Sequence, residues 1–136
     1  MAAKIVEAAI LEALDDYNAA HAADWEFGLY ENNFTPDVNT VLGDLTEASF
    51  PGYARQPVAA IAAAAYDNVD SRGEAVFDPI TFVLSTDGGP YDMYGYFVYD
   101  TVAARLVWAN IFPGAPITLA LTGDGIRLNL TEIMPS

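Results

Sequence analysis

The sequence predicts a mainly β protein, an antiparallel β-sandwich of jelly-roll type preceded by an N-terminal amphipathic α-helix. Runs rich in aromatic and β-branched residues follow one another at short spacing through residues 24–136. Clusters of Gly, Pro, Asp and Asn separate these runs, as turns do. No long helical pattern comes between them, which disfavours a parallel α/β sheet. We therefore divide the chain into a helical arm, residues 1–23, and a β-sandwich domain, residues 24–136.

The leading segment, residues 3–22, has the composition of a helix, with alanines, leucines and glutamates and neither Gly nor Pro. An isolated helix of this length is marginal in water, so its apolar stripe must pack on something. We predict that the stripe is an interface with another copy or a partner. The alternative is that it folds back on its own sheet. The residues of the stripe are Val6, Ile10, Leu14 and Tyr17.

The region after the arm changes to the two-residue period of a strand. Residues 25–31 alternate bulky apolar residues with Glu and Gly, which predicts a strand with one buried face. A turn follows at residues 32–37. Residues 40–50 are ambiguous, and we expect a short helical turn there that directs Leu42, Leu45 and Phe50 inward and ends at Pro51.

The remaining chain predicts one strand after another, with turns at residues 67–73, 86–90 and 122–125. The alanines of residues 58–66 are also compatible with a helix, and Pro79 indicates a sheet edge or a bulge. The dipeptide Asp124-Gly125 is typical of a hairpin. The predicted strands are residues 58–66, 75–85, 93–100, 105–112, 117–121 and 126–133.

The composition excludes several classes of function. The 136 residues carry a formal charge of −14 and include no cysteine. Strong acidity repels nucleic acid phosphates, and a chain without cysteine has neither disulfides nor thiolate metal sites. No apolar run is long enough for a membrane span. The acidity serves solubility, or else it favours docking on a basic partner surface.

Few residues suggest catalysis. His21 is the only histidine, so it cannot build a histidine metal site, and a position near a helix end suits it as a complement to the dipole. Asp87 and Asp92 resemble a glycosidase pair only in residue type. The turn at residues 67–73 offers oxygens to calcium without the spacing of an EF-hand. We therefore predict no catalytic residue, no cofactor and no enzymatic activity.

Two segments resemble a family of small virion proteins of tailed bacteriophages. The first segment is residues 29–53, and it contains Leu-Tyr-Glu-Asn-Asn-Phe-Thr-Pro at residues 29–36 and Thr-Val-Leu-Gly-Asp-Leu-Thr-Glu-Ala at residues 40–48. The second segment comprises residues 94–98 and 106–109. The resemblance covers roughly residues 25–133 and leaves the arm outside. It implies a component of the particle and brings no catalytic residues with it.

From the resemblance we expect a capsid cement or decoration protein on the capsid surface. Its expected partners are the major capsid protein and copies of itself, as a homotrimer, and the trimer rests on an analogy with accessory proteins at threefold positions of icosahedral shells. A tail or fibre component is the alternative within the virion. A carbohydrate-binding module is the alternative from another class, because aromatic side chains on strands can stack on sugars.

Overall fold

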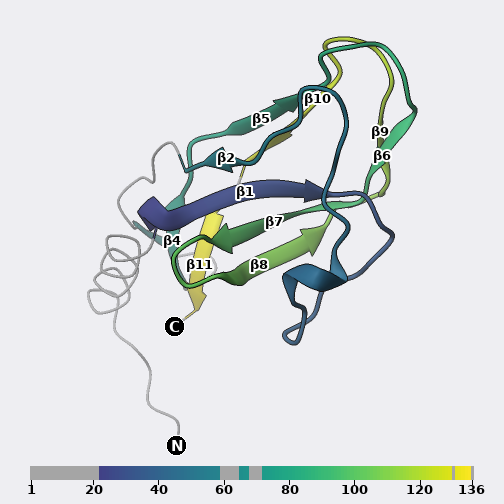
Figure 1. The fold of residues 1–136 in the computed structure, drawn as a ribbon. Helices are drawn as coiled ribbons and strands as arrows, with labels where there is room; N and C mark the ends of the chain where they lie inside the picture. The colour runs from purple at the N-terminus through teal and green to yellow at the C-terminus, as the bar shows by residue number, and fades with distance from the viewer. Residues whose placement is uncertain (1–21, 59–64, 68–71, 130, 136) are drawn as a thin grey trace, which may run out of the picture. The chain divides into compact units, whose positions relative to one another are not determined.

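The computed structural model describes residues 22–58, 65–67, 72–129 and 131–135 (Figure 1). Its strands pair in antiparallel sheets, which confirms the prediction of a mainly β protein. A single turn of 3-10 helix, η1 (Ala22–Asp24), leads into the first strand. The predicted arm helix, with its stripe of Val6, Ile10, Leu14 and Tyr17, lies outside the described residues, and so does His21.

The chain forms two compact units. Unit 1 contains residues 1–23, 58–80 and 128–136, and unit 2 contains residues 24–57 and 81–127. In unit 1 the described strands form one sheet in the order β11-β4-β3. Their bounds are β3 (Ala65–Asp67), β4 (Arg72–Val76) and β11 (Thr131–Pro135).

Unit 2 is built on a four-stranded sheet in the order β2-β1-β7-β8 (Figure 1). The central pair runs in register from Trp25 opposite Asp100 to Tyr30 opposite Gly95. These strands confirm the predicted strands 25–31 and 105–112 and the larger part of the predicted strand 93–100, although β1 is buried on both faces and not on one. Their bounds are β1 (Trp25–Tyr30), β2 (Gln56–Pro57), β7 (Gly95–Asp100) and β8 (Arg105–Ile111).

Two further strand pairs are β5 (Ile80–Val83) with β10 (Gly125–Leu128), which lies in unit 2 except for Ile80 and Leu128, and β6 (Tyr91–Met93) with β9 (Ile117–Leu119), which lies wholly in unit 2. The predicted hairpin at Asp124-Gly125 is therefore wrong, since β9 and β10 pair with different neighbours. The turn itself is present. The Asp124 carboxylate accepts the backbone N–H groups of Ala120 and Leu121, both at 2.9 Å, and turns the chain without pairing its flanks.

Three predicted strands are wrong in extent because each is interrupted. The predicted strand 75–85 separates into β4 and β5 around Pro79, which has no N–H to give to a ladder. The strand 93–100 is divided at Tyr94, and the strand 126–133 is divided between β10 and β11. Of the predicted strand 58–66, only Ala65 and Tyr66 lie in a described strand.

The covering segment, residues 31–55 between β1 and β2, packs side chains on one face of the main sheet. It holds the short helical turn that the sequence predicts, η2 (Leu42–Asp44), and it buries Leu45 and Phe50 as expected, while Leu42 is only partly buried. Leu45 packs with Tyr30 and Phe97 in a buried cluster. The side chains around this cluster come from the same segment, from the residue before β7, and from β7 and β8, and they are Phe34, Leu42, Tyr94, Tyr99, Leu106 and Ala109.

Candidate functional site

The outer edge of β1 is completed by a side chain. At its start, Phe27 lies opposite Gln56 of β2. Further along, residues 46–48 take over, because Ala48 N–H donates to the Leu29 carbonyl at 2.9 Å. Between these two partners the Leu29 N–H donates to the Tyr53 hydroxyl at 3.2 Å. The hydroxyl therefore takes the place that a strand carbonyl would have in the ladder.

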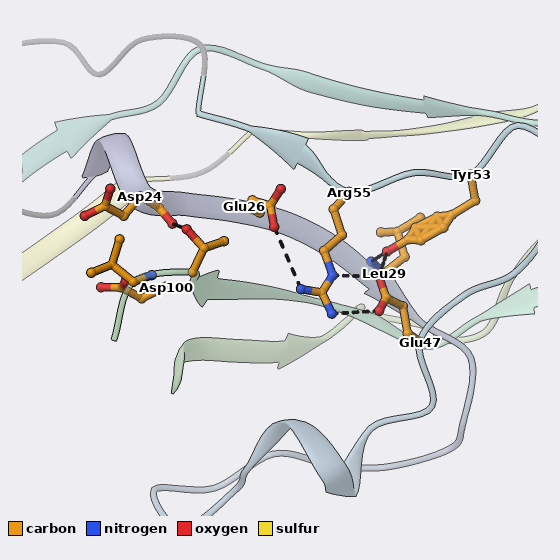
Figure 2. A network of polar contacts seen from close by, with 9 residues as sticks. Asp24, Glu26, Leu29, Glu47, Tyr53, Arg55 and Asp100 are labelled. Atoms are coloured by element: carbon orange, nitrogen blue, oxygen red, sulfur yellow. Dashed lines mark hydrogen bonds and ion pairs between the residues drawn. The ribbon is translucent and has the colours of Figure 1, made fainter. Parts of the chain in front are cut away.

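Tyr53 belongs to a polar clamp with Glu47 and Arg55 (Figure 2). Its hydroxyl donates to Glu47 Oε2 at 2.8 Å. Arg55 binds the same carboxylate with two donors, Nε to Oε2 at 2.9 Å and Nη2 to Oε1 at 2.8 Å. The guanidinium also lies 5.4 Å from the Phe97 ring centroid and 5.1 Å from that of Tyr99, within the range of cation–π attraction.

The pKa shifts of the clamp follow from these contacts. Hydrogen bonds from Arg55 lower the pKa of Glu47, so the carboxylate stays ionised. Burial raises the pKa of Tyr53, which keeps its hydroxyl protonated and able to donate. Tyr53 also accepts the Leu29 N–H at 3.2 Å, and Arg55 Nη1 lies 3.8 Å from Glu26 Oε1, so two of these groups reach β1. The clamp therefore acts as a fastening between β1 and the covering segment.

A second set of polar contacts fixes the turn between β7 and β8 to the start of β1 (Figure 2). The Asp24 carbonyl accepts the N–H and the hydroxyl of Thr101, both at 2.9 Å. The buried carboxylate of Asp100 accepts the N–H groups of Val102 and Ala103 at 3.0 and 2.9 Å. The turn is therefore held in place, although Val102 at its tip is 75% exposed.

A groove follows β8 on the side of the covering segment. It consists of two hollows of about 350 and 360 Å³ that share Thr40 and Leu106 in their walls. Val38 and Trp108 line the first hollow. Val41 lines the second. One wall is thus the loop of residues 36–43, and the other is β8.

The loop that forms this wall is braced by its own hydrogen bonds. Asp37 N–H donates to Thr40 Oγ1 at 2.8 Å, and the Asp37 carboxylate accepts the Asn39 N–H at 2.8 Å. Val41 N–H donates to Asp44 Oδ2 at 3.0 Å. The loop nevertheless presents two apolar side chains to solvent, Val38 at 99% exposure and Val41 at 59%. Both valines line the groove, so they form a local apolar surface beside it.

Strand β8 forms the edge of the sheet within the described residues (Figure 1). Phe112 N–H donates to the Tyr94 carbonyl at 2.8 Å, which sets the phase of the β7–β8 ladder. Since backbone groups alternate in direction along an antiparallel strand, Ala109 and Ile111 turn theirs away from β7. The opposite edge strand, β2, has only two residues, and one of them is Pro57.

The two tryptophans have different environments. Trp25 is buried, with 1% of its surface exposed, so it cannot stack on a sugar. Trp108 is half-buried and meets Trp25 edge-on, with ring centroids 5.4 Å apart. Burial raises the pKa of Tyr96, against the opposing effect of hydrogen bonds from the side chains of Asn110 and Trp108. These contacts hold the Trp108 ring beside Trp25 and Tyr96.

Asp87 and Asp92, the two carboxylates compared with a glycosidase pair, form hydrogen bonds to different partners. Asp87 accepts the backbone N–H and the hydroxyl of Thr122 at 2.6 and 2.7 Å, and Asp92 accepts the hydroxyl of Thr118 at 2.6 Å. Most of the turn at residues 67–73 lies outside the described residues. Among the residues that are described, no cluster of three or more His, Cys, Asp or Glu side chains is arranged to hold a metal ion. In the same part of the chain, no helix has the length and apolar character to cross a membrane.

The groove was not predicted from the sequence. The only sequence feature that points to it is weak, namely two valines, Val38 and Val41, just after the turn at residues 32–37. The chain matches no protein-family model, no curated protein and no solved structure.

Proposed function

We propose that this protein is a bacteriophage virion structural protein, a capsid cement or decoration protein that binds and stabilises the shell of the major capsid protein. One observation carries the proposal. The two segments that resemble phage virion proteins, far apart in the sequence, pack on one another. Tyr30 and Leu45 of the first segment share a buried cluster with Phe97 of the second. Because residues of both segments lie in one buried cluster, the resemblance applies to a folded module and not to two separate stretches of sequence.

The surface of that module supports a contact function. Unit 2 carries ten carboxylates and three arginines, yet it exposes apolar side chains on a braced loop. The polar groups of the clamp, Glu47, Tyr53 and Arg55, form hydrogen bonds within the protein. An acidic surface with a local apolar groove suits docking on a basic partner surface, where charge guides the encounter and apolar contacts hold the complex.

The finer architecture that we propose is a jelly-roll-like sandwich. The order β2-β1-β7-β8 supports it, because β1 pairs with a strand far along the chain, as Greek-key sheets require. A crystal structure of the full chain tests this point. Two facing sheets joined by Greek-key connections are expected, and an open single-layer arrangement would contradict it.

We also propose that residues 1–23 form an arm that joins copies into a homotrimer or docks on the coat. The apolar stripe of Val6, Ile10, Leu14 and Tyr17 supports this, at about 1.5–3 kcal/mol for each buried side chain. Deletion of residues 1–20 tests it by light scattering and by co-sedimentation with capsids. The truncated chain should lose its oligomeric state or its binding, and retention of both would make the arm a local lid.

Fractionation of virions tests the main proposal. Particles of the phage that encodes this chain are separated into heads and tails, and each fraction is quantified by mass spectrometry against the major capsid protein. We expect stoichiometric copies on heads. Recovery on tails alone would replace the cement function with the tail or fibre function, and absence from both fractions would refute a virion role.

A further inference from the structure

We propose that the outer edge of β8 binds an extended, basic segment of a partner protein, which adds to the sheet of described strands as a fifth strand and places apolar side chains in the groove. This inference rests on the proposed function only for the identity of the partner, a virion protein. The mode of binding follows from the edge, the groove and the charge of unit 2.

The first argument is the edge itself. Natural proteins protect exposed edges with short strands, Pro or charged residues. The β2 edge follows this rule, because it has two residues and ends in Pro57. The β8 edge has seven residues, no Pro and one charge, on Arg105 at its start. Seven residues extend about 23 Å, long enough for a peptide to make several backbone hydrogen bonds.

The second argument is the groove beside that edge. Leu106 and Ala109 lie on the sheet face that packs against the Tyr30 cluster, and the loop with Val38 and Thr40 borders the same face. A strand added to β8 directs alternate side chains to this face. These side chains would meet the hollow between the loop and β8. Backbone pairing thus supplies affinity, and the hollow selects apolar residues at alternate positions.

The third argument is charge, which decides the occupant. Unit 2 has ten carboxylates against three arginines, and Asp37 lies in the wall of the hollow next to Val38. A second copy would bring another formal charge of −14 to this edge and be repelled. A segment with lysines or arginines on its outward positions is attracted instead. Its basic residues are expected at the Asp37 end of β8, away from Arg105.

The test uses the full-length protein labelled for NMR and two synthetic heptapeptides of alternating sequence. One is Lys-Val-Lys-Ile-Lys-Val-Lys, and the other has Glu in place of each Lys. We expect the basic peptide to shift the backbone amides of Ala109, Ile111 and Val38 in a saturable way that weakens with salt. The acidic peptide should cause no such shift.

Matched variants locate the site. Val38→Lys should weaken binding of the basic peptide about tenfold, through lost apolar contact and repulsion. Leu121→Lys makes the same change of charge at a side chain that is 62% exposed in another turn, and it should change binding by less than about twofold. Ala109→Pro removes an outward N–H and should abolish strand addition. If the Ala109→Pro variant fails to fold, the effect of Val38→Lys on peptide binding still shows whether the peptide binds at this site.

Several outcomes would overturn the inference. They are equal binding of both peptides, shifts confined to other strands, no saturable shift at millimolar peptide, and dimerisation of the protein through β8. Failure here is distinct from failure of the proposed function. Peptide binding by a protein absent from virions leaves the edge site standing, and a virion protein with an inert edge removes only the edge site.

Discussion

Replacing Tyr53 with Phe removes the one hydroxyl that completes the β1 ladder while keeping the ring. The ring still packs near Phe50 and Phe82, at centroid distances of 5.4 and 5.8 Å. The Leu29 N–H, on a residue with 0% exposure, loses its acceptor. Glu47 loses one donor but keeps both bonds from Arg55. An unsatisfied buried N–H costs about 1–3 kcal/mol, so we expect a loss of about 2–3 kcal/mol in unfolding free energy.

Urea unfolding followed by tryptophan fluorescence measures this loss, with an unchanged dependence on denaturant as the sign that the folded state is intact. Tyr30→Phe is the matched control. The Tyr30 hydroxyl donates a single bond to the Phe34 carbonyl at 2.9 Å, and its loss should cost about 1 kcal/mol. A Tyr53→Phe loss below about 0.5 kcal/mol, or one smaller than that of Tyr30→Phe, would refute the role of the hydroxyl in the ladder.

Three further predictions concern pH and packing in unit 2. Arg55 lowers the pKa of Glu47 in the folded protein, so the ionised Glu47 adds to the free energy of unfolding. This contribution is fully present above the ordinary carboxyl pKa and is lost as pH falls through the lowered pKa. Arg55→Met should flatten this acid slope in urea titrations, and an unchanged slope would contradict the assignment. Burial raises the pKa of Tyr30 from 10.0 to about 12, so stability should be full below pH 10.0 and should decline between there and pH 12, as tyrosinate absorbance and circular dichroism can show together. Gly95→Ala places a Cβ against a β8 carbonyl and the Tyr30 ring, and it should cost about 3 kcal/mol in thermal unfolding. Gly43→Ala meets open space and should stay within about 0.5 kcal/mol, so equal costs would refute the packing argument.

The central strands could be predicted because their local signals agree with their environment. β1, β7 and β8 are rich in aromatic and β-branched residues and need no distant contact to be recognised. A helical turn was also expected in the ambiguous segment 40–50, and η2 lies there, with Leu45 and Phe50 buried and Leu42 partly buried. In these places propensity, pattern and burial favour the same structure.

The pairing of strands could not be predicted in the same way. Asp124-Gly125 forms a turn, but the choice of neighbours for β9 and β10 depends on β6 and β5, far away in the sequence. The groove is hidden for the same reason, since the loop with Val38 and the strand with Trp108 are brought together only by the fold. The clamp of Tyr53 with Glu47 and Arg55 spans few residues, yet nothing in their spacing shows a shared hydrogen-bond network.

The order of strands in unit 2 also has a consequence for synthesis on the ribosome. β1 pairs with β7 from Trp25 opposite Asp100, so its central partner emerges about 70 residues later. At about 5–20 residues per second, β1 waits several seconds or longer with its apolar residues unpaired on that side. β2, residues 46–48 and the Tyr53 hydroxyl emerge much sooner and lie on its other edge. The clamp therefore belongs to the part of the sheet that can form first, and we expect it to hold one edge of β1 in a nascent chain that still lacks the other.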